Sequence, residues 1–507
     1  MSAKDGTDLP AGWALARLSE VATVIMGQSP PSSTYNDSGV GLPFFQGKAE
    51  FGSLYAEPRV WCSRPNKIAQ TDDILLSVRA PVGPTNLAPA VCCIGRGLAA
   101  VRPKTGVALR YLLHAFRRFA DDLDARGTGT TFKAVSGQVV RDLPLPIAPA
   151  SEQERIADAL DELLSDLDAG VAALERVRAK LKLYRAAVLK AAVEGALTAE
   201  WRKHQAQTEP AAELLKRILT ERRRRWEAEQ LRKFKDKGRE PPKNWKAKYK
   251  EPAAPDMTGL PPLPEGWCWV TVEQLATVTS GQTPPGMPTT STQDDGILWF
   301  RVADMNVPGN EGWMRNGGLR LSFGSARSLG VKLLPAGSII FPKRGGAIAT
   351  NKKRRLKFAA GCDLNLMAVT PVAPADEYLW LWFLALDLAK LSDGSNVPQI
   401  NNPDIIPRAV PLPSLVEQQV IVEIVEGQLS VIDHLEADLA SKITSAQALR
   451  QSILRHAFSG RLVPQDPNDE PASELLKRIA AEREQRAREA TAAKRMNGRK
   501  PSRREKP

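Results

Sequence analysis

The side chains that stand out for their chemistry are clustered basic residues in the second half of the chain. The segment Gly345–Lys357, GGAIATNKKRRLK, follows Lys343 and Arg344, and together they contain seven Lys or Arg and no acidic residue. Guanidinium and ammonium groups suit the phosphates and base edges of DNA, and a glycine-rich loop can enter a groove. We therefore favour a DNA-binding loop here over a solvated hairpin without a ligand.

Loops elsewhere carry further donors and acceptors. The segment GTGTTFK (127–133) in the first half corresponds to GSNVPQ (394–399) in the second half. The candidate DNA contacts are Lys48, Arg79, Thr131, Lys133, Lys343, Arg344, Lys352, Lys353, Arg354, Arg355, Asn396 and Gln399. Outside the basic run, a surface loop without DNA contact is at least as good an interpretation. Trp13 and Trp267 could stack on bases, but their place at the start of each half favours packing anchors.

Common catalytic signatures are missing from the sequence. The Gly47-Lys48 pair is followed by Ala49 and completes no GxxxxGK[ST] phosphate loop. The four histidines are scattered, and the five cysteines form no CxxC pair, so we expect neither a metal site nor a disulfide framework. Asn402-Pro403-Asp404 lacks the second proline and the aromatic residue of an adenine-methyltransferase motif. Together these absences favour a binding protein without catalytic residues.

Length and charge bound the class of protein. A chain of 507 residues predicts three or four domains. Residues 201–250 hold 17 Lys/Arg against 7 Asp/Glu, and residues 477–507 hold 12 against 4. These two segments carry the whole positive excess behind the net charge of +13, because the rest of the chain is net negative. Such segments either contact nucleic acid or form solvated linkers, and both interpretations stay open. The longest apolar run has nine residues, far short of a membrane span, so we expect a cytoplasmic protein.

The chain is an internal duplication. LPAGWALARLSEVATVIMGQSPP (9–31) returns as LPEGWCWVTVEQLATVTSGQTPP (263–285), with 11 of 23 positions identical. EPAAELLKRILTERR (209–223) returns as EPASELLKRIAAERE (470–484), with 11 of 15 identical. Each half therefore contains a mixed α/β segment followed by a long helix. The mixed segments predict strands at 73–78, 97–101 and 338–341, and helices at 107–123 and 375–391.

Heptad spacing predicts that the two long helices pack on each other. Ser151 and Glu154 form a capping box at the start of the first helix, which would extend about 70 Å to Leu197. The predicted seam is Ile156, Leu160, Leu163, Leu167, Leu174, Val177 and Leu181 in the first helix, and Val425, Ile432, Leu435, Leu439, Leu449 and Ile453 in the second. The alternative is two separate helices, each packed on its own domain.

This pattern resembles the DNA-specificity (S) subunit of type I restriction-modification systems. The resemblance is carried by the paired LPxGW starts, the paired GQ[ST]PP turns, the PLP…EQ…I junctions, and EGAL (194–197) matching SGRL (459–462). It implies an α+β fold with two mixed α/β target-recognition domains separated by an antiparallel two-helix coiled coil, duplicated with pseudo-twofold symmetry. The expected segments are recognition domains at 1–150 and 263–413, helical regions at 151–197 and 414–463, a basic linker at 198–262 and a basic tail at 464–507.

The resemblance also implies partners and a non-catalytic role. Each recognition domain would read one half of a split, asymmetric double-stranded DNA site. Two methyltransferase (M) subunits would carry S-adenosylmethionine, and restriction (R) subunits would carry ATP and Mg, so this chain itself would hold no cofactor. Two other classes remain open: an enzyme with unfamiliar motifs, such as a self-sufficient methyltransferase or nuclease, and a coiled-coil scaffold that binds proteins only.

Overall fold

The computed structural model describes residues 9–129, 133–205, 209–291, 296–372, 374–392 and 397–497. The chain divides into two compact units. Unit 1 comprises residues 1–176 and 439–507, and unit 2 comprises residues 177–438. Among the helices described, none is long and apolar enough to cross a membrane.

Unit 1 contains a mixed α/β domain built mainly on antiparallel strands, with β4 and β9 paired in parallel. Its strands are β1 (Ala14–Arg17), β2 (Ala22–Met26), β3 (Tyr35–Asn36), β4 (Leu42–Phe45), β5 (Trp61–Cys62), β6 (Ile68–Ala69), β7 (Ile74–Ser77), β8 (Thr85–Leu87), β9 (Cys92–Ile94), β10 (Leu98–Pro103) and β11 (Pro144–Ile147). They form sheets in the orders β2-β10-β7-β8, β3-β5-β4-β9-β6 and β1-β11. Its helices are α1 (Leu18–Val21), α2 (Leu109–Arg118), α3 (Ala120–Ala125), α4 (Gly137–Arg141) and α13 (Ala472–Asn497), with 3-10 helices η1 (Ser32–Thr34) and η2 (Lys48–Glu50).

Unit 2 repeats this plan. Its strands are β12 (Cys268–Thr271), β13 (Ala276–Ser280), β14 (Ile297–Phe300), β15 (Trp313–Met314), β16 (Leu319–Leu321), β17 (Ile339–Pro342), β18 (Arg354–Leu356), β19 (Ala360–Cys362), β20 (Leu366–Pro371) and β21 (Ala409–Leu412). They form sheets in the orders β13-β20-β17-β18-β15, β16-β14-β19 and β12-β21. Its helices are α6 (Ala199–His204), α7 (Ala211–Asp236), α8 (Val272–Leu275), α9 (Phe323–Ser328), α10 (Asp376–Ala385) and α11 (Asn402–Ile405), with 3-10 helices η3 (Trp245–Lys248), η4 (Val302–Asn306), η5 (Gly345–Thr350) and η6 (Leu388–Leu391).

The repeated Gly-Gln pairs have a steric cause. Gly27 donates its N–H to the carbonyl of Leu98 at 2.9 Å, and Gly281 donates to Leu366 at 2.9 Å. A Cβ at Gly27 would lie 2.1 Å from the carbonyl oxygen of Gly95, and a Cβ at Gly281 would lie 1.9 Å from that of Asp363. Only glycine permits this close approach of two backbone segments, so the motif marks the same backbone contact in both units.

The two mixed-segment helices are shorter than predicted. The helix expected over 107–123 is broken at Phe119, whose φ of −99° and ψ of 15° separate α2 from α3. The helix expected over 375–391 ends at Ala385, and Asp387 then caps η6 by accepting the N–H of Ala389 at 3.1 Å. Both helices pack into the cores, where Tyr111 and Tyr378 are fully enclosed.

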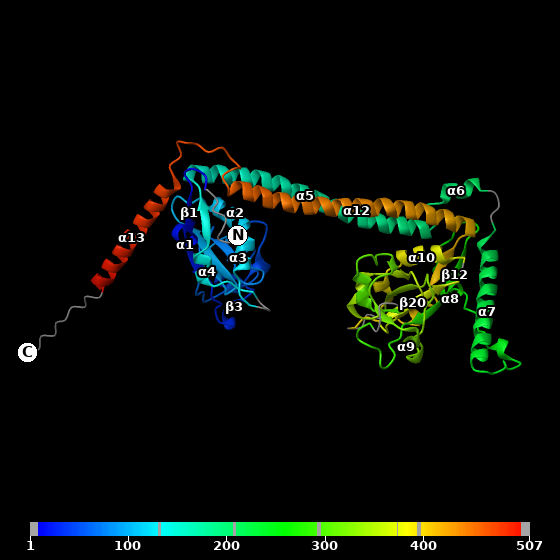
Figure 1. Ribbon diagram of the computed structural model, residues 1–507. Coiled ribbons are helices and arrows are strands. Elements are labelled where there is room, and N and C mark those ends of the chain that lie inside the picture. Colours follow the sequence, from blue (N-terminus) through cyan, green and yellow to red (C-terminus); the bar gives the residue numbers. More distant parts are fainter. Residues whose placement is uncertain are drawn as a thin grey trace, which may run out of the picture. The chain divides into compact units, whose positions relative to one another are not determined.

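The long helices α5 (Ala150–Val193) and α12 (Leu415–Ala457) each contribute to both units (Figure 1). In unit 1, the first turns of α5 and the last turns of α12 share one core, and Arg450 forms an ion pair with Asp168. In unit 2, the last turns of α5 pack with the first turns of α12, and Arg185 pairs with Asp433 and with Glu436. Within each unit the helices therefore run antiparallel, which confirms the predicted fold class.

The predicted seam is only partly correct. Ile156, Leu160, Val425, Ile432 and Leu439 are buried, and Leu167, Leu174, Leu181 and Ile453 are half-buried. Leu163, Val177, Leu435 and Leu449 are instead exposed by 41–51%. Near its start α5 buries Leu164 in place of Leu163, because a spacing of four residues keeps its apolar stripe against the domain core. Ala150 opens α5, so Ser151 lies inside the first turn and is not its N-cap.

One interpretation of the sequence was that the linker and the C-terminal segment are solvated throughout. The structure contradicts this, because part of each segment is buried. Ala211, Leu214 and Ile218 of α7 enter the core of unit 2, which also contains Trp267. Their repeats in α13, Ala472, Leu475 and Ile479, enter the core of unit 1. The two helices begin alike, because Ala211 donates to the carbonyl of Gly266 at 2.9 Å and Ala472 to that of Gly12 at 2.8 Å. Each half thus supplies a helix that completes the unit holding the other half's sheets.

Candidate nucleic-acid interface

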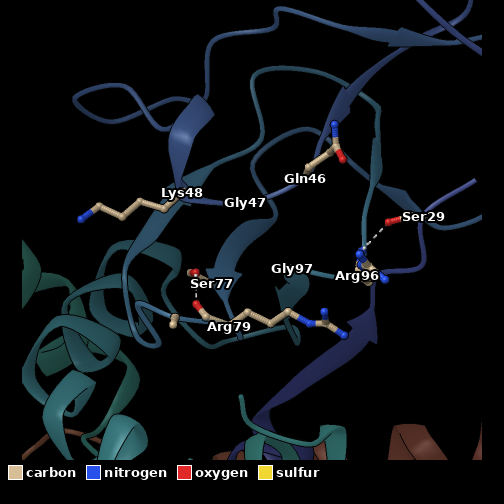
Figure 2. Close-up of a pocket in the computed structure, with 9 residues that line it drawn as sticks. Ser29, Gln46, Gly47, Lys48, Ser77, Arg79, Arg96 and Gly97 are labelled. Carbon is tan, nitrogen blue, oxygen red and sulfur yellow. Dashed lines mark hydrogen bonds between the residues drawn. The ribbon is translucent and has the colours of Figure 1, made fainter. Parts of the chain in front are cut away.

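A pocket of about 220 Å³ opens where four loops of unit 1 meet (Figure 2). Its lining residues are Ser29, Gln46, Gly47, Lys48, Ser77, Arg79, Ala80, Arg96 and Gly97. Ser77 ends β7, and the other lining residues follow β2, β4 or β7 or lie between β9 and β10, so strand ends position the whole lining. The structure thereby brings together Lys48 and Arg79, two of the predicted DNA contacts.

The pocket is electropositive. Lys48, Arg79 and Arg96 are exposed, and none of the lining residues is acidic. Glu50 lies next to the lining, where its Oε2 accepts the backbone N–H of Gly47 at 3.0 Å. None of the three side chains forms an ion pair with another residue in the described ranges. Three unneutralised cations in one concavity favour anions such as phosphates, and their N–H groups also suit guanine acceptors.

Backbone hydrogen bonds on both sides fix the position of Arg79. Val78 donates to the carbonyl of Gly97 at 2.9 Å, and Ala80 donates to that of Lys133 at 2.9 Å. Ser77 donates its hydroxyl to the carbonyls of Arg79, at 3.1 Å, and Pro81, at 2.9 Å. The backbone of Arg79 is therefore held on both sides while its guanidinium points to solvent.

Unit 2 holds Arg344 by the same bonds. Lys343 donates to the carbonyl of Asn365 at 2.8 Å, and Gly345 donates to that of Pro398 at 2.8 Å. Arg344 forms an isolated antiparallel β-bridge with Gln399, and Arg79 forms the same kind of bridge with Ala134. Arg79 and Arg344 are thus equivalent residues of the duplicated domain, and these bonds align Lys133 and Ala134 with Pro398 and Gln399. The wider correspondence of segments 127–133 and 394–399 stays a prediction. Arg344 is exposed and forms no ion pair within the described part of the chain.

The basic run around Lys353 is not the exposed loop that we expected. It contains η5 and the strand β18, which pairs with β17 and β15 inside a sheet. Lys353 is buried and donates to Asn351 Oδ1 at 2.9 Å and to the carbonyl of Leu386, and burial lowers its pKa to about 8. Lys343 is also buried and donates to Ser280 Oγ at 2.9 Å, while burial lowers its pKa.

The arginines of this run are engaged within unit 2 as well. Arg355 pairs with Glu377 at 2.5 Å, and its guanidinium carbon lies 4.0 Å from the ring centroid of Trp313. Arg354 donates to the carbonyl of Lys353 at 2.8 Å, and Lys352 donates to Asn306 Oδ1. The expectation that the run as a whole clamps phosphates needs correction, because sheet formation turns Lys353 and Arg355 into structural residues.

Two further predicted contacts, Lys133 and Gln399, form side-chain bonds within the protein. Lys133 pairs with Asp124 at 2.5 Å, and the amide of Gln399 donates to Asn401 Oδ1 at 2.7 Å. Thr131 and Asn396 lie outside the described residues. The sequence interpretation missed Arg96 and Gln46. The repeated GQ[ST]PP motif could have indicated them, because its residue Ser29 lines the same pocket. Arg96 donates its backbone N–H to Ser29 Oγ at 3.3 Å, as Leu364 does to Thr283 Oγ1 at 3.3 Å.

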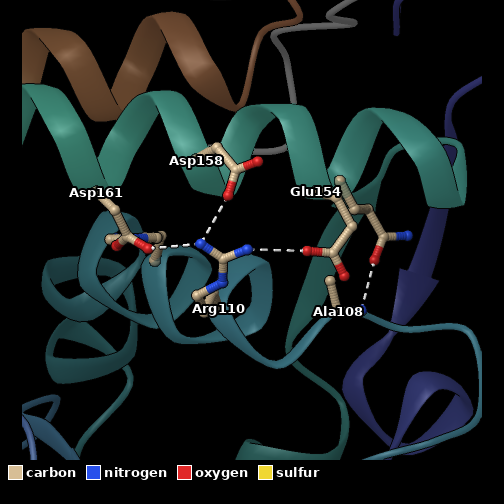
Figure 3. A network of polar contacts seen from close by, with 7 residues as sticks. Ala108, Arg110, Glu154, Asp158 and Asp161 are labelled. Carbon is tan, nitrogen blue, oxygen red and sulfur yellow. Dashed lines mark hydrogen bonds and ion pairs between the residues drawn. The ribbon is translucent and has the colours of Figure 1, made fainter.

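An ionic network ties the unit 1 domain to α5 (Figure 3). Arg110 on α2 contacts Glu154 at 3.2 Å, Asp158 at 2.7 Å and Asp161 at 3.0 Å. His114 reaches Asp161 at 2.8 Å, and burial lowers the pKa of this histidine. The sheet ends that carry the pocket are therefore fastened to the long helix through α2.

Known proteins share this architecture and sequence. A family model for the type I restriction modification DNA specificity domain matches residues 10–176 and again residues 264–445. A stretch of 163 residues is 40% identical to the putative type I restriction enzyme MjaX specificity subunit of Methanocaldococcus jannaschii, covering 31% of this chain and 38% of that protein. The type I restriction enzyme EcoDI specificity subunit of Escherichia coli is 24% identical over 489 residues, which is 94% of this chain and 96% of that protein.

A solved structure agrees with these matches. A chain from a structure on complex assembly and conformational transition of the type I R-M system superposes with a TM-score of 0.59 and 18% identity. The superposition covers 89% of this chain and 99% of that one, which shows a common fold. Because the two family matches cover most of the chain, each on one half of the duplication, this protein belongs to the family of type I restriction modification DNA specificity subunits.

Proposed function

We propose that this chain is the non-catalytic subunit that gives a type I restriction-modification complex its DNA sequence specificity. Each mixed α/β domain would read one half of a bipartite DNA site. The observation that carries the proposal is the equivalence of Arg79 and Arg344, two exposed arginines held by the same backbone bonds on duplicated domains. The side chains around them differ between the domains, so the two half-sites would differ too.

The paired helices would act as the ruler between half-sites. The helix α5 has 44 residues and α12 has 43, so each is about 65 Å long at 1.5 Å per residue. On α5, Asp168 and Arg185 are separated by as many residues as Arg450 and Asp433, their ion-pair partners on α12. Equal separations between the partners on the two helices are what an antiparallel pairing would require. Half-sites on one face of a duplex lie about 34–36 Å apart, or a multiple of this.

Catalysis would belong to partner subunits. Membership of the family supports two methyltransferase (M) subunits carrying S-adenosylmethionine, and restriction (R) subunits carrying ATP and Mg. The exposed apolar side chains along the paired helices, such as Leu183 and Val431, are the kind of surface that protein partners cover. This chain would contribute DNA selection and the placement of those partners.

Two measurements test the proposal: methylation mapping, and binding of the assembled complex to DNA of different sequences. The purified chain is incubated with S-adenosylmethionine and DNA, alone and with its M subunit, and methylation is mapped by sequencing. We expect methylated adenines at one split motif, and only with the M subunit. Methyl transfer by the chain alone would show an enzyme instead. A complex without sequence-selective DNA binding would show a protein scaffold.

A further inference from the structure

We propose that the residue directly after β4 in unit 1 and after β14 in unit 2 reads a base, and that the half-sites diverge there. This residue is Gln46 in unit 1 and Arg301 in unit 2. The inference rests on the proposed function, since it assigns base-reading residues within that DNA interface. It assigns an adenine to Gln46 and a guanine to Arg301.

Strand pairing makes the two residues equivalent. In unit 1, β4 runs parallel to β9, and Gly95 donates to the carbonyl of Phe45 at 2.8 Å. In unit 2, β14 runs parallel to β19, and Asp363 donates to the carbonyl of Phe300 at 2.9 Å. Gln46 and Arg301 come next in the chain, so their side chains leave the same strand end in the two copies of the domain.

The backbone of Gln46 is fixed, whereas its side-chain amide is exposed. It lines the pocket together with Lys48, Arg79 and Arg96 (Figure 2). The backbone at Gln46 is tightly packed, because a Cβ at Gly97 would lie 2.2 Å from its carbonyl oxygen. Its exposed side chain forms no hydrogen bond with another residue in the part of the chain described. A fixed backbone and an exposed amide, in a pocket that Lys48, Arg79 and Arg96 also line, suit base recognition next to a phosphate.

Arg301 is oriented in a comparable way. Its guanidinium carbon lies 5.8 Å from the ring centroid of Trp299, and one N–H contacts the carbonyl of Thr289 at 3.4 Å. A guanidinium has five N–H donors, so most of them remain available for a ligand. The exposed position of Arg301 leaves this fork open to solvent.

The two side chains match different bases. A glutamine amide pairs in two-pronged fashion with N6 and N7 of adenine, whereas an arginine fork pairs with O6 and N7 of guanine. The arginine at position 79 or 344 is the same in both units, which suits a shared phosphate contact that carries no sequence information. The strand-end residue changes between units, which suits a base contact.

The test is to exchange the side chain in the full chain and read the motif. We assemble Gln46→Arg with the M partner, methylate genomic DNA and sequence the methylome. One position of the first half-site should change its preference from A·T to G·C, by about 5- to 150-fold, while the second half-site stays unchanged. Arg301→Gln should weaken a G·C preference in the second half-site only. Gln70→Arg adds the same charge at an exposed residue of unit 1 outside the pocket and should leave the motif unchanged.

Binding selection from a randomised DNA library covers the case in which methylation is lost. In that assay Gln46→Ala should relax one position of the first half-site without selecting a new base. A Gln46→Ala complex that retains discrimination at every position would overturn the inference, as would an active Gln46→Arg complex with the original motif. If the wild-type complex selects no sequence at all, the proposed function fails instead.

Discussion

The indole Nε1 of Trp13 donates a hydrogen bond to Glu152 Oε2 at 3.0 Å and joins the start of the unit 1 domain to the first turn of α5. Trp267 donates to Glu417 Oε2 at 2.8 Å in the same way in unit 2. Both tryptophans are buried, with exposed fractions of 8% and 9%, so their rings cannot stack on bases. The repeated LPxGW motif is therefore a packing anchor, as predicted, and it fixes each domain on a long helix.

Loss of this anchor should destabilise the unit without changing the DNA motif. Trp13→Phe leaves a buried carboxylate without its donor, which costs about 1–3 kcal/mol. Chemical unfolding of the full chain measures the change. Trp269→Phe is the control, because Trp269 is half-buried and donates only at 3.2 Å to the carbonyl of Pro261. An equal loss in both variants would contradict the anchor role.

Burial should make the contribution of Glu152 depend on pH. Desolvation raises the pKa of Glu152 in the folded protein, although the bond from Trp13 opposes this rise. The folded state then binds more protons than the unfolded state between the unfolded and folded pKa values, so stability falls as pH rises through that window. Glu152→Gln keeps an acceptor for Trp13 but does not titrate. The wild-type chain should lose stability relative to this variant from about pH 4 upward, then level off above the folded pKa. Unfolding titrations at several pH values measure this, and a constant difference would refute it.

Arg79 should contribute to DNA affinity through a phosphate. Arg79→Ala should weaken binding at low salt and reduce the slope of log affinity against log salt by about one unit. Base preference should stay the same. Arg344→Ala should do the same in unit 2. Arg17→Ala removes an equally charged but ion-paired residue from unit 1 and serves as the control. An unchanged slope for both variants would place the arginines outside the interface.

Arg355 should behave as a structural residue. Arg355→Ala removes the ion pair with Glu377 and the contact with the Trp313 ring, which together are worth about 1–3 kcal/mol. The free energy of unfolding should fall, whereas the salt slope of DNA binding should not change. A lower salt slope in a fully stable variant would restore Arg355 as a phosphate contact.

Lengthening both long helices should lengthen the DNA spacer. One heptad is inserted after Leu174 of α5 and one after Ile443 of α12, which keeps the antiparallel pairing in step. Seven residues add about 10.5 Å, which is about three base pairs at 3.4 Å each. Methylome sequencing should show the same half-sites with a longer gap. Affinity should also fall, because three base pairs turn one half-site by about 100° around the duplex. An active variant with the original spacing would show that the helices are not the ruler.

The sequence by itself determined the duplication and the order of the segments, and it favoured pairing of the two long helices over two separate helices. Local patterns carry these features: repeated Gly-Trp and Gly-Gln pairs, and apolar residues three and four positions apart. It also indicated Lys48, Arg79 and Arg344, because loops at strand ends carry exposed side chains. It could not separate exposed from buried members of a basic run, since Lys352 and Lys353 are adjacent and chemically alike in the chain.

Only the tertiary structure decided which charges face solvent and which loops meet. Arg355 lies in β18, which joins a sheet, and its side chain contacts Trp313 and Glu377. Lys353 directly precedes β18, is buried and donates to the carbonyl of Leu386. Arg96 and Gln46 are 50 residues apart in the chain, yet they line one pocket because β4 and β9 are hydrogen-bonded neighbours. Each of the helices α7 and α13 packs against the sheets of the other half of the duplication, because three of its apolar side chains are buried there. The sequence shows these apolar side chains, but only the folded chain shows which core contains them.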